Sequence, residues 1–312
     1  MDVLSDILAV CRSEHAAPAR IALTAPWGLA STGVPGALVR FARGAPYWME
    51  VQGEAPIQVA PGDLVLLPPM LPHRIVSQPG VPVATFDELI ARHSDGPRDE
   101  NPLVFALGGG GPGTELFSTQ VWLSAYCRHT VLPLMQPFIH ARAQDMVLAA
   151  SLGALMESVT QECLARRPGW RLSAARMGEL LLVNLLRAHL ARHPAPGSGW
   201  LRGLADPGTA RALQRMHRAP EQGWTLASLA REAGMSRTRF SERFRELVGT
   251  TPIGYLTAHR MALAAQALEE AAMPLARIAE RAGYDSAKVF ARAFRRWSGS
   301  PPSVWARREA QR

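Results

Sequence analysis

The chain has 312 residues, of which 47% are hydrophobic and 19% charged, a composition typical of globular proteins. Its length exceeds what one hydrophobic core usually serves, so two domains are expected. Residues 201–312 hold 19 Lys and Arg against 10 Asp and Glu, a net charge of +9, whereas residues 1–200 hold 15 against 16. A basic domain beside a neutral one favours a polyanionic partner for the basic domain and a different task for the other.

No secretory or membrane-spanning segment is expected. Asp2 and Asp6 stand where a secretory signal needs positive charge. The longest apolar stretch, Met146–Met156, is far shorter than the roughly 20 residues that cross a bilayer. The sequence therefore predicts a cytoplasmic protein without a membrane partner.

Short apolar runs alternate with turn residues from Trp27 to about Phe86, which predicts a small all-β domain. The segment GDLVLLPPMLPH, Gly62–His73, has a Gly-x5-Pro-x4-His spacing that resembles the second motif of the cupin barrel. The glycine of that motif closes a hairpin turn. Met70 departs from the motif, because a glycine is usual at its position.

His73 is the residue of this motif that could bear chemistry. The resemblance implies that cupin enzymes join this histidine to a His-x-His and a Glu from an earlier strand to hold a metal. Residues 37–51 contain no histidine, so His73 is expected to be a hydrogen-bonded structural residue at a barrel rim. A small-molecule effector pocket lined by Trp27, Phe41, Trp48 and His73 stays open, although these aromatic side chains suit a core equally well.

Residues 93–114 are rich in glycine, proline and acidic residues, which indicates a mobile loop. The Gly108–Gly111 run lacks the following Gly-Lys-Ser/Thr and the helix start of a phosphate-binding loop. ELFSTQVWLSAY, residues 115–126, predicts a strand instead.

Two helices are expected after this strand. Apolar residues recur at helical spacing over 145–166, and a second helix is predicted over 173–192 with Ser173 as its N-cap. Only Asn184 interrupts the apolar residues of 180–186, so the second helix is apolar on more than one side. A homodimer interface and simple packing between domains both account for this pattern.

The C-terminal part contains one sequence pattern twice. Three positions of the first copy recur 49 residues later, and four recur 50 residues later. The pairs are Leu226 and Leu275, Leu229 and Ile278, Gly234 and Gly283, Phe240 and Phe290, Phe244 and Phe294, Gly249 and Gly299, and Pro252 and Pro302. This indicates a duplicated structural unit with one inserted residue.

Each copy has the features of a helix-turn-helix. Gly234 is placed to end one helix and Ser236 to cap the next. In the second copy Gly283 ends a helix, and Asp285 or Ser286 caps the one that follows. Two helices joined by a short glycine-containing turn form a helix-turn-helix.

The second helix of each copy is the predicted DNA-recognition helix. Phe240 and Phe290 must face the core, so the opposite faces carry the candidate contacts. Arg and Lys can reach guanine acceptors, Ser and Thr either base type, and Ala a thymine methyl. The candidate DNA-binding residues are Ser236, Arg237, Thr238, Arg239, Ser241, Glu242 and Arg245, with Ser286, Ala287, Lys288, Ala291, Arg292 and Arg295. Arg292 and Lys288 are the first choices for base contacts.

Two further helix starts are candidate phosphate contacts. Thr251 and Ser300 stand before prolines that begin helices, and free N–H groups at helix N-termini bind phosphate. The helix expected over 253–271 fixes the separation of the two copies. Two recognition helices on one side of B-DNA must lie about 34 Å apart.

Residues 205–309 resemble the DNA-binding domain of the AraC/XylS family of transcription regulators. The matching motifs are DPGTARALQRMH, REAGMS, RAGYDS and FRRWSGSPPSVWARR. The first 200 residues resemble the cupin-like sensor domain of one subgroup of that family. The resemblance implies a transcription regulator rather than an enzyme, with operator DNA as partner, RNA polymerase as a further candidate partner, a small-molecule effector and no cofactor. The base-reading positions it implies are Thr238, Ser241, Glu242, Ala287, Lys288 and Arg292.

The predicted fold class is α+β, a cupin-like β-barrel plus a helical segment followed by an all-α domain with two helix-turn-helix units. The predicted sensor domain covers residues 1–142, and a helical dimerisation segment covers 143–193. A linker is expected at 194–204, where the composition is rich in proline and glycine. The DNA-binding domain then covers 205–312.

A thiol switch is a further alternative. The family pattern suggests that many relatives of this subgroup carry a Cys-Gly pair soon after a Glu-Leu, but this chain has Ser118-Thr119 after Glu115-Leu116. A switch would have to use Cys11, Cys127 or Cys163. These three cysteines are too far apart for a disulfide framework or a zinc site, so buried free thiols are expected.

Overall fold

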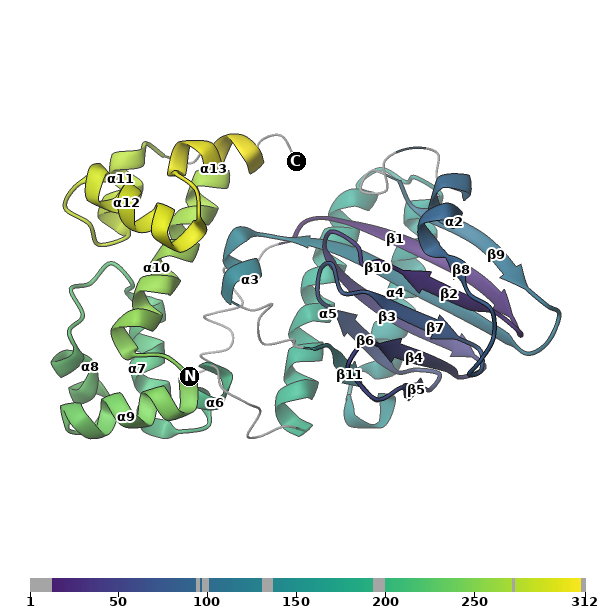
Figure 1. Cartoon of the computed structure of the whole chain (residues 1–312), viewed down its shortest axis with the longest axis horizontal. Helices are drawn as coiled ribbons and strands as arrows, with labels where there is room; N and C mark the ends of the chain where they lie inside the picture. The colour runs from purple at the N-terminus through teal and green to yellow at the C-terminus, as the bar shows by residue number, and fades with distance from the viewer. Residues whose placement is uncertain are drawn as a thin grey trace. The chain divides into compact units, whose positions relative to one another are not determined.

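The structure is a computed structural model that describes residues 13–93, 96, 101–130, 137–192, 200–270 and 273–309. It divides into two units (Figure 1). The β-rich unit consists of the described residues of Ser13–Leu123 and Met135–Arg192. The helical unit consists of the described residues of Ser124–Leu134 and His193–Arg312.

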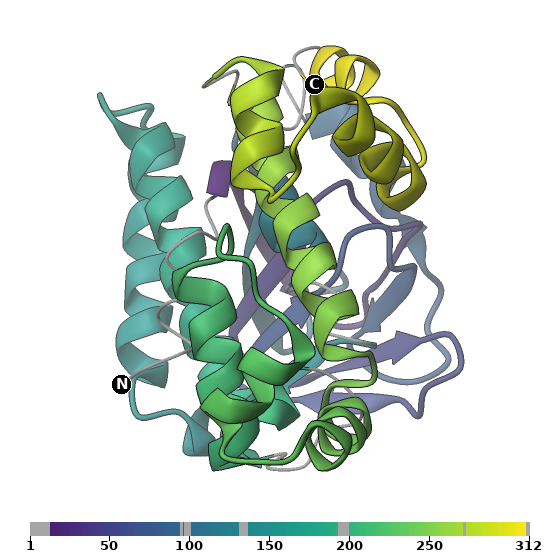
Figure 2. The ribbon, with the colours of Figure 1, turned by 90° about the vertical axis from the view of Figure 1, so that its left-hand side faces the viewer.

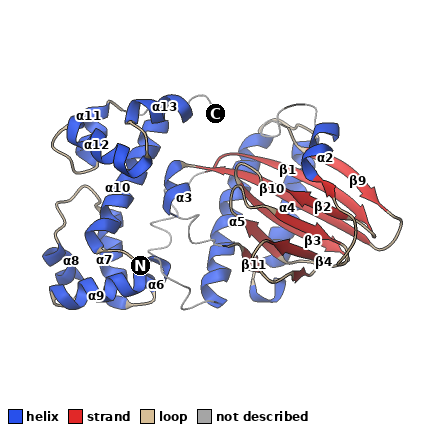
Figure 3. Cartoon of the chain, in the orientation of Figure 1, coloured by secondary structure: helices blue, strands red, loops and turns tan. Residues whose placement is uncertain are grey.

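Two sheets make up the β-rich unit (Figure 3). The six-stranded sheet has the order β11 (Ile139–Ala141), β6 (Leu64–Leu67), β3 (Ala37–Gly44), β10 (Gly113–Leu123), β1 (Ser13–Thr24) and β9 (Leu103–Gly108). The five-stranded sheet has the order β5 (Ile57–Val59), β4 (Tyr47–Val51), β7 (His73–Val76), β2 (Gly28–Ser31) and β8 (Ala84–Thr85). Most neighbouring strands are antiparallel, but β9 pairs parallel to β1 and β8 parallel to β2.

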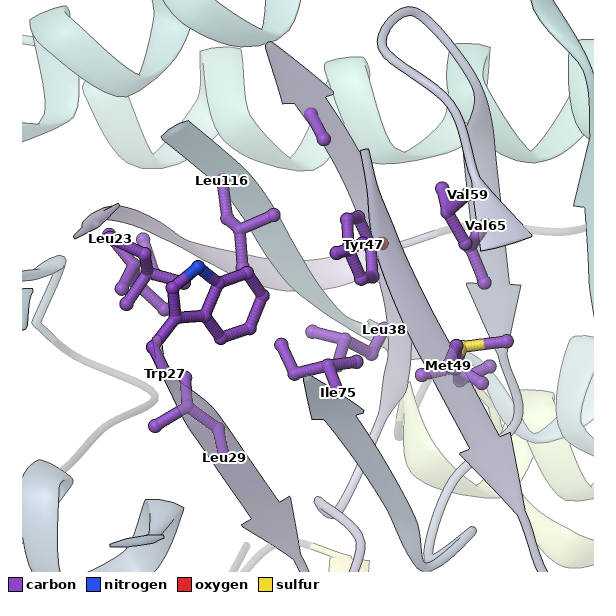
Figure 4. Close-up of a cluster of buried hydrophobic side chains, with 14 of the residues drawn as sticks. Leu23, Trp27, Leu29, Leu38, Tyr47, Met49, Val59, Val65, Ile75 and Leu116 are labelled. Atoms are coloured by element: carbon purple, nitrogen blue, oxygen red, sulfur yellow. The ribbon is translucent and has the colours of Figure 1, made fainter. Parts of the chain in front are cut away.

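One apolar core lies between the two sheets (Figure 4). Side chains alternate between the two faces of a strand. In β4 this places Tyr47, Met49 and Val51 in the core and leaves Trp48 and Glu50 more exposed. The N-terminal domain therefore has the cupin-like architecture that the sequence predicts, as two facing sheets.

Helices cover the other face of the six-stranded sheet. The helix α4 (Ala149–Leu164) contacts β1 and β10, and α5 (Trp170–Arg192) contacts β1, β10 and β11. Gly153 brings α4 so close to the sheet that a Cβ there would overlap the Phe41 ring. The unit also contains α2 (Phe86–His93) and a short 3-10 helix, Ala143–Asp145.

Most of the apolar surface of α5 is buried within its own unit. Leu181, Leu182, Leu185 and Leu186 are all buried. They account for much of the apolar surface on several sides of the helix, since α5 packs against both α4 and the sheet. Leu180 stays exposed.

Several predicted boundaries in this unit are wrong. The strand β1 lies before Trp27, where no strand was expected, and it forms because β10 and β9 pair with its two edges. The predicted loop 93–114 contains β9, which is stabilised by the same pairing. The helix α4 starts at Ala149 rather than at residue 145, and α5 starts at Trp170, so Ser173 is not its N-cap.

The second unit is entirely helical among its described residues. Its helices are α3 (Ala125–Thr130), α6 (Trp200–Leu204), α7 (Pro207–Arg218), α8 (Leu226–Ala233), α9 (Arg237–Val248), α10 (Pro252–Glu269), α11 (Leu275–Arg281), α12 (Ala287–Ser298) and α13 (Pro302–Glu309). The long helix α10 runs along the unit and contacts α3, α8, α9, α11, α12 and α13 (Figure 2). Over the described part of the chain, no helix is long and apolar enough to cross a membrane.

Two segments differ from the predicted domain plan. Residues 194–199 of the expected linker lie outside the described residues, and Trp200–Leu204 forms α6 rather than linker. The helix α3 falls within the predicted sensor domain, 1–142, but packs in the helical unit. The strand predicted over 115–126 accordingly ends at Leu123.

The contacts of α3 are specific. Tyr126 Oη lies 3.1 Å from His259 Nδ1 of α10 and 3.4 Å from His217 Nδ1 of α7. Arg128 pairs with Glu269 of α10 at 2.6 Å. Burial, followed by the charge of the neighbouring arginine, lowers the pKa of His259 to about 3. Burial, followed by the charge of His259, also lowers the pKa of His217 well below its usual value. Both imidazoles are therefore neutral at physiological pH and join α3 to the helical core through hydrogen bonds.

Candidate nucleic-acid interface

The first helix-turn-helix consists of α8 and α9, and its turn follows the predicted chemistry. Thr225 and Ser228 form a reciprocal capping box at the start of α8. Gly234 ends α8 at φ 70°, in the left-handed region that glycine adopts without strain. The Ser236 hydroxyl then accepts a hydrogen bond from the Arg239 backbone N–H at 3.4 Å and caps α9.

The second helix-turn-helix consists of α11 and α12. Gly283, at φ 78°, provides the left-handed turn. The cap of α12 is Ser286 rather than Asp285, because the Ser286 hydroxyl accepts from the Val289 N–H at 3.3 Å. Both recognition helices end at left-handed glycines, Gly249 and Gly299. The duplication predicted from the sequence is therefore a duplication of structure.

The aromatic residues define the inner face of each recognition helix. Phe240 and Phe244 of α9 and Phe290 and Phe294 of α12 are all fully buried. Because the two phenylalanines of each helix lie four positions apart, they form one side of that helix. The other side of each helix faces solvent.

The predicted contact residues lie on these outer faces. Ser241, Ala287 and Ala291 are half-buried, and the other side chains are exposed. The exposed members are Ser236, Arg237, Thr238, Arg239, Glu242 and Arg245 in the first unit and Ser286, Lys288, Arg292 and Arg295 in the second. The hydroxyls of Ser236 and Ser286 act as helix caps, so their first role is to begin the recognition helices.

Ion pairing separates two classes of basic residue in the helical unit. Arg243 pairs with Asp206 and Glu246, and Arg215 pairs with Glu232 at 2.8 Å. Among the residues that the structure describes, the basic side chains of the recognition faces form no ion pair. These are Arg237, Arg239, Arg245, Lys288, Arg292 and Arg295. No carboxylate in the described part of the chain offsets their charges, as a surface that binds DNA phosphates and base edges requires.

The two candidate phosphate contacts differ in the structure. The Thr251 hydroxyl accepts from the Gly254 N–H at 3.0 Å and caps α10. The sequence predicted Ser300 as the N-cap of the last helix. The helix α13 starts at Pro302, so its N-cap position is Pro301, and Ser300 lies one residue before that position. The Ser300 backbone N–H instead donates to Ser298 Oγ at 3.3 Å.

Val289 is a candidate contact that the sequence did not suggest. It lies in the first turn of α12 beside Lys288, and 54% of its surface is exposed. An exposed apolar side chain on a recognition helix can contact a thymine methyl group. In the sequence, the only indication that Val289 faces outward is its position next to Phe290, which must face the core.

The four proposed pocket residues do not converge. Trp27 and His73 are buried between the sheets, His73 with Nδ1 donating to the Leu71 carbonyl at 3.0 Å. Phe41 lies on the opposite face of β3, against Gly153 of α4. Trp48 is half-buried and also faces away from the core. Strand alternation therefore removes Phe41 and Trp48 from any pocket between the sheets.

The described residues contain no group of three His, Cys, Asp or Glu side chains that could hold a metal ion. His73 is buried, not at a rim. Cys127 and Cys163 are buried free thiols, and Cys11 lies outside the described residues. Burial, and then the charge of Glu162, raise the pKa of Cys163 to about 12, which disfavours the reactive thiolate.

Comparison with known proteins assigns both parts of the chain. Residues 2–191 match the cupin family, and residues 229–308 match a family described as a helix-turn-helix domain. A protein of Streptomyces lividans named as an AraC-like transcription regulator is 34% identical over 310 residues, covering 97% of each chain. A regulator of the same description from Streptomyces antibioticus is 32% identical over 305 residues, again covering 97% of each chain.

Among solved structures, the DNA-binding domain of AdpA in complex with a target DNA is 31% identical. It covers 34% of this chain and 96% of that one, with a TM-score of 0.32. The near full-length relatives and the two matched domains agree with the tandem helix-turn-helix geometry described above. The chain belongs to the family of AraC-like DNA-binding transcription regulators.

Proposed function

We propose that α9 and α12 enter two adjacent major-groove segments of one operator. The observation that supports this most is the set of unpaired basic side chains on two equivalent helices that pack against one connecting helix. An α-helix of the 18 residues of α10 is about 27 Å long. This length is comparable to one turn of B-DNA, about 34 Å.

The two recognition faces differ in charge. The outer face of α12 combines Lys288, Arg292 and Arg295, whereas Glu242 interrupts the basic face of α9. The second helix-turn-helix therefore contributes more phosphate attraction. The first depends more on shorter polar side chains such as Thr238 for selectivity.

Arg292→Ala should weaken operator binding by about 1–3 kcal/mol and relax the sequence preference, because it removes a base contact. Titration of the full chain with operator and with random DNA measures both effects. Arg277→Ala is the matched control, since Arg277 is an exposed arginine of the same unit that pairs with Glu280 at 2.6 Å. An equal loss on operator and random DNA would rule out base reading by Arg292.

The spacing of the two segments tests the tandem arrangement. An operator is first selected from genomic fragments with the purified chain. Five base pairs inserted between its two segments should lower affinity at least about tenfold, because they rotate one segment by half a turn. The same insertion outside the site is the control. Unchanged affinity would show that one recognition helix suffices.

The helix α3 is the element through which we propose that the N-terminal domain modulates DNA binding. It directly follows β10 in the chain and packs on the helical unit through Tyr126 and Arg128. The His129 ring also packs against the Trp297 ring of α12, with ring centroids 4.4 Å apart and the ring planes inclined at 53°. One short helix thus contacts α7, the connecting helix α10 and the second recognition helix, α12, and in this proposal it restrains the position of α10.

Tyr126→Phe combined with Glu269→Gln should make the helical unit more tolerant of operator spacing. The penalty for the five-base-pair insertion should fall severalfold, because α3 would restrain α10 less. Arg176→Gln, which breaks the exposed ion pair of Arg176 with Glu179 in α5, is the control. If the insertion lowers affinity equally in the native chain, the control and the double variant, α3 has no restraining role.

A homodimer through the α4–α5 segment is also proposed. After α5 packs against its own unit, Leu172 and Leu180 remain 62% and 44% exposed, eight residues apart on one side of the helix. Apolar side chains left exposed at helical spacing suit a partner helix.

The native chain should sediment as a dimer, and Leu172→Glu with Leu180→Glu should give a monomer, because two charges would have to be buried in the interface. Val104→Glu, at a 46% exposed position of β9, should leave the mass unchanged. A native monomer, or a dimer that survives the double change, would refute this interface.

A further inference from the structure

Arg40 is a buried cation whose hydrogen bonding is incomplete. It lies in β3, and only 3% of its surface is exposed. Its Nε donates to Ser118 Oγ at 3.3 Å, while Nη1 is buried with no hydrogen-bond partner. No described carboxylate forms an ion pair with it. A buried charge without a partner costs several kcal/mol, so this arrangement needs a compensating group.

The neighbouring titratable side chains do not supply the missing negative charge. Burial raises the pKa of Tyr47, and the charge of Arg40 only opposes that shift, so the phenol stays protonated. The Tyr47 hydroxyl interacts with the Arg40 guanidinium, but a neutral phenol does not balance the charge of that group. Burial, followed by the charge of Arg40, lowers the pKa of His73 to about 4, so His73 is neutral. Arg40 itself remains charged, because a guanidinium does not deprotonate in proteins.

Asp63, whose charge also acts on Tyr47, is already engaged elsewhere. Its carboxylate accepts from the backbone N–H of Ala60 at 3.1 Å and of Ala143 at 2.9 Å, and His140 Nε2 lies 2.8 Å away. These three contacts hold the carboxylate at the edge where β6 meets β11. The charge of Arg40 therefore stays uncompensated within the described residues.

A small cavity adjoins Arg40. Its polar lining comes from Ser31, Arg40, His73, Ser118 and Gln120. The apolar lining consists of Ala19, Leu29, Ala30, Val34, Leu38, Ile75 and Phe86. The cavity has a volume of about 20 Å³, which is room for one water-sized group. Ser31, Val34 and Phe86 are half-buried, so the cavity reaches the surface on their side.

We propose that this cavity is the effector site of the N-terminal domain and that it takes a small carboxylate, held by Arg40 with its apolar part against Leu29 and Ile75. This proposal gives a chemical class to the effector in the proposed function, and it rests on that function for its regulatory role. The binding itself does not depend on it. The site differs from the pocket expected from the sequence, since only His73 is common to both.

A carboxylate matches the charge of Arg40 better than the other simple occupants do. A water molecule could complete the hydrogen bonding of Nη1 but would leave the charge uncompensated. A phosphate would bring nearly two negative charges to one cation among mostly apolar walls, at a high desolvation cost. A guanidinium can bind a carboxylate through two parallel hydrogen bonds. To admit the second oxygen and the carbon chain, the walls at Val34 and Phe86 must move apart.

Butanoate is the probe, because its short apolar chain suits the apolar lining. Thermal unfolding of the full chain in sodium butanoate should show a midpoint at least about 2 °C higher than in sodium chloride of equal ionic strength, since a ligand that binds only the folded state stabilises it. Butanamide, which has the same shape without the charge, should give no rise. Equal midpoints in butanoate and chloride would overturn the proposal.

Arg40→Met should remove the butanoate effect, because it deletes the cation while keeping an unbranched apolar side chain. Arg74→Met, which changes an exposed arginine of β7 paired with Glu50, should retain it. A butanoate effect that survives in Arg40→Met would also overturn the proposal. If Arg40→Met fails to fold, calorimetric titration of the native chain with butanoate still tests binding. Absence of measurable heat of binding would overturn the proposal.

Operator affinity measured with and without butanoate separates this site from the proposed function. A severalfold change in affinity that is absent in Arg40→Met supports an effector role. Butanoate binding with unchanged operator affinity would overturn the effector role and leave DNA binding intact. Absence of operator binding under all conditions would instead overturn the proposed function.

Discussion

The DNA-binding half of this protein depends on the burial of α10. Tyr255 and Leu256 in its first half are buried toward the first helix-turn-helix, where Tyr255 packs on Phe244. Met261 and Ala265 in its second half belong to the core of the second helix-turn-helix. Because one helix is shared by both cores, its packing links the orientations of the two recognition helices. The apolar packing of α10 thus sets the relative positions of the charged side chains on α9 and α12.

Charge pairing adds a second level of organisation to the same unit. Arginines that hold helices together, such as Arg243, pair with carboxylates, whereas Arg292 and Lys288 form no ion pair within the residues that the structure describes. The β-rich unit shows the opposite case in Arg40, which is unpaired although it is buried. An unpaired cation costs little in water but several kcal/mol in a core. The exposed ones therefore suit an extended polyanion, and the buried one suits a small anion that can enter a cavity.

The duplicated unit could be predicted from sequence because its determinants are local. Gly234 and Ser236 fix a turn by their own backbone and side-chain chemistry. The strand β1 could not be predicted, because its alanine-rich sequence is extended only where β9 and β10 pair with it. Likewise, the place of α3 in the helical unit depends on contacts with His217 and His259, about 90 to 130 residues away in sequence. The site at Arg40 was missed because its signal is a missing partner, which only a three-dimensional structure reveals.

Methylation interference on the selected operator tests the central claim most directly, since methyl groups at guanine N7 block contacts in the major groove. If α9 and α12 both read DNA from one chain, the interfering guanines should fall into two clusters whose centres lie about 10 base pairs apart on one side of the duplex. A single cluster per bound chain, or two clusters on opposite sides of the duplex, would contradict the account.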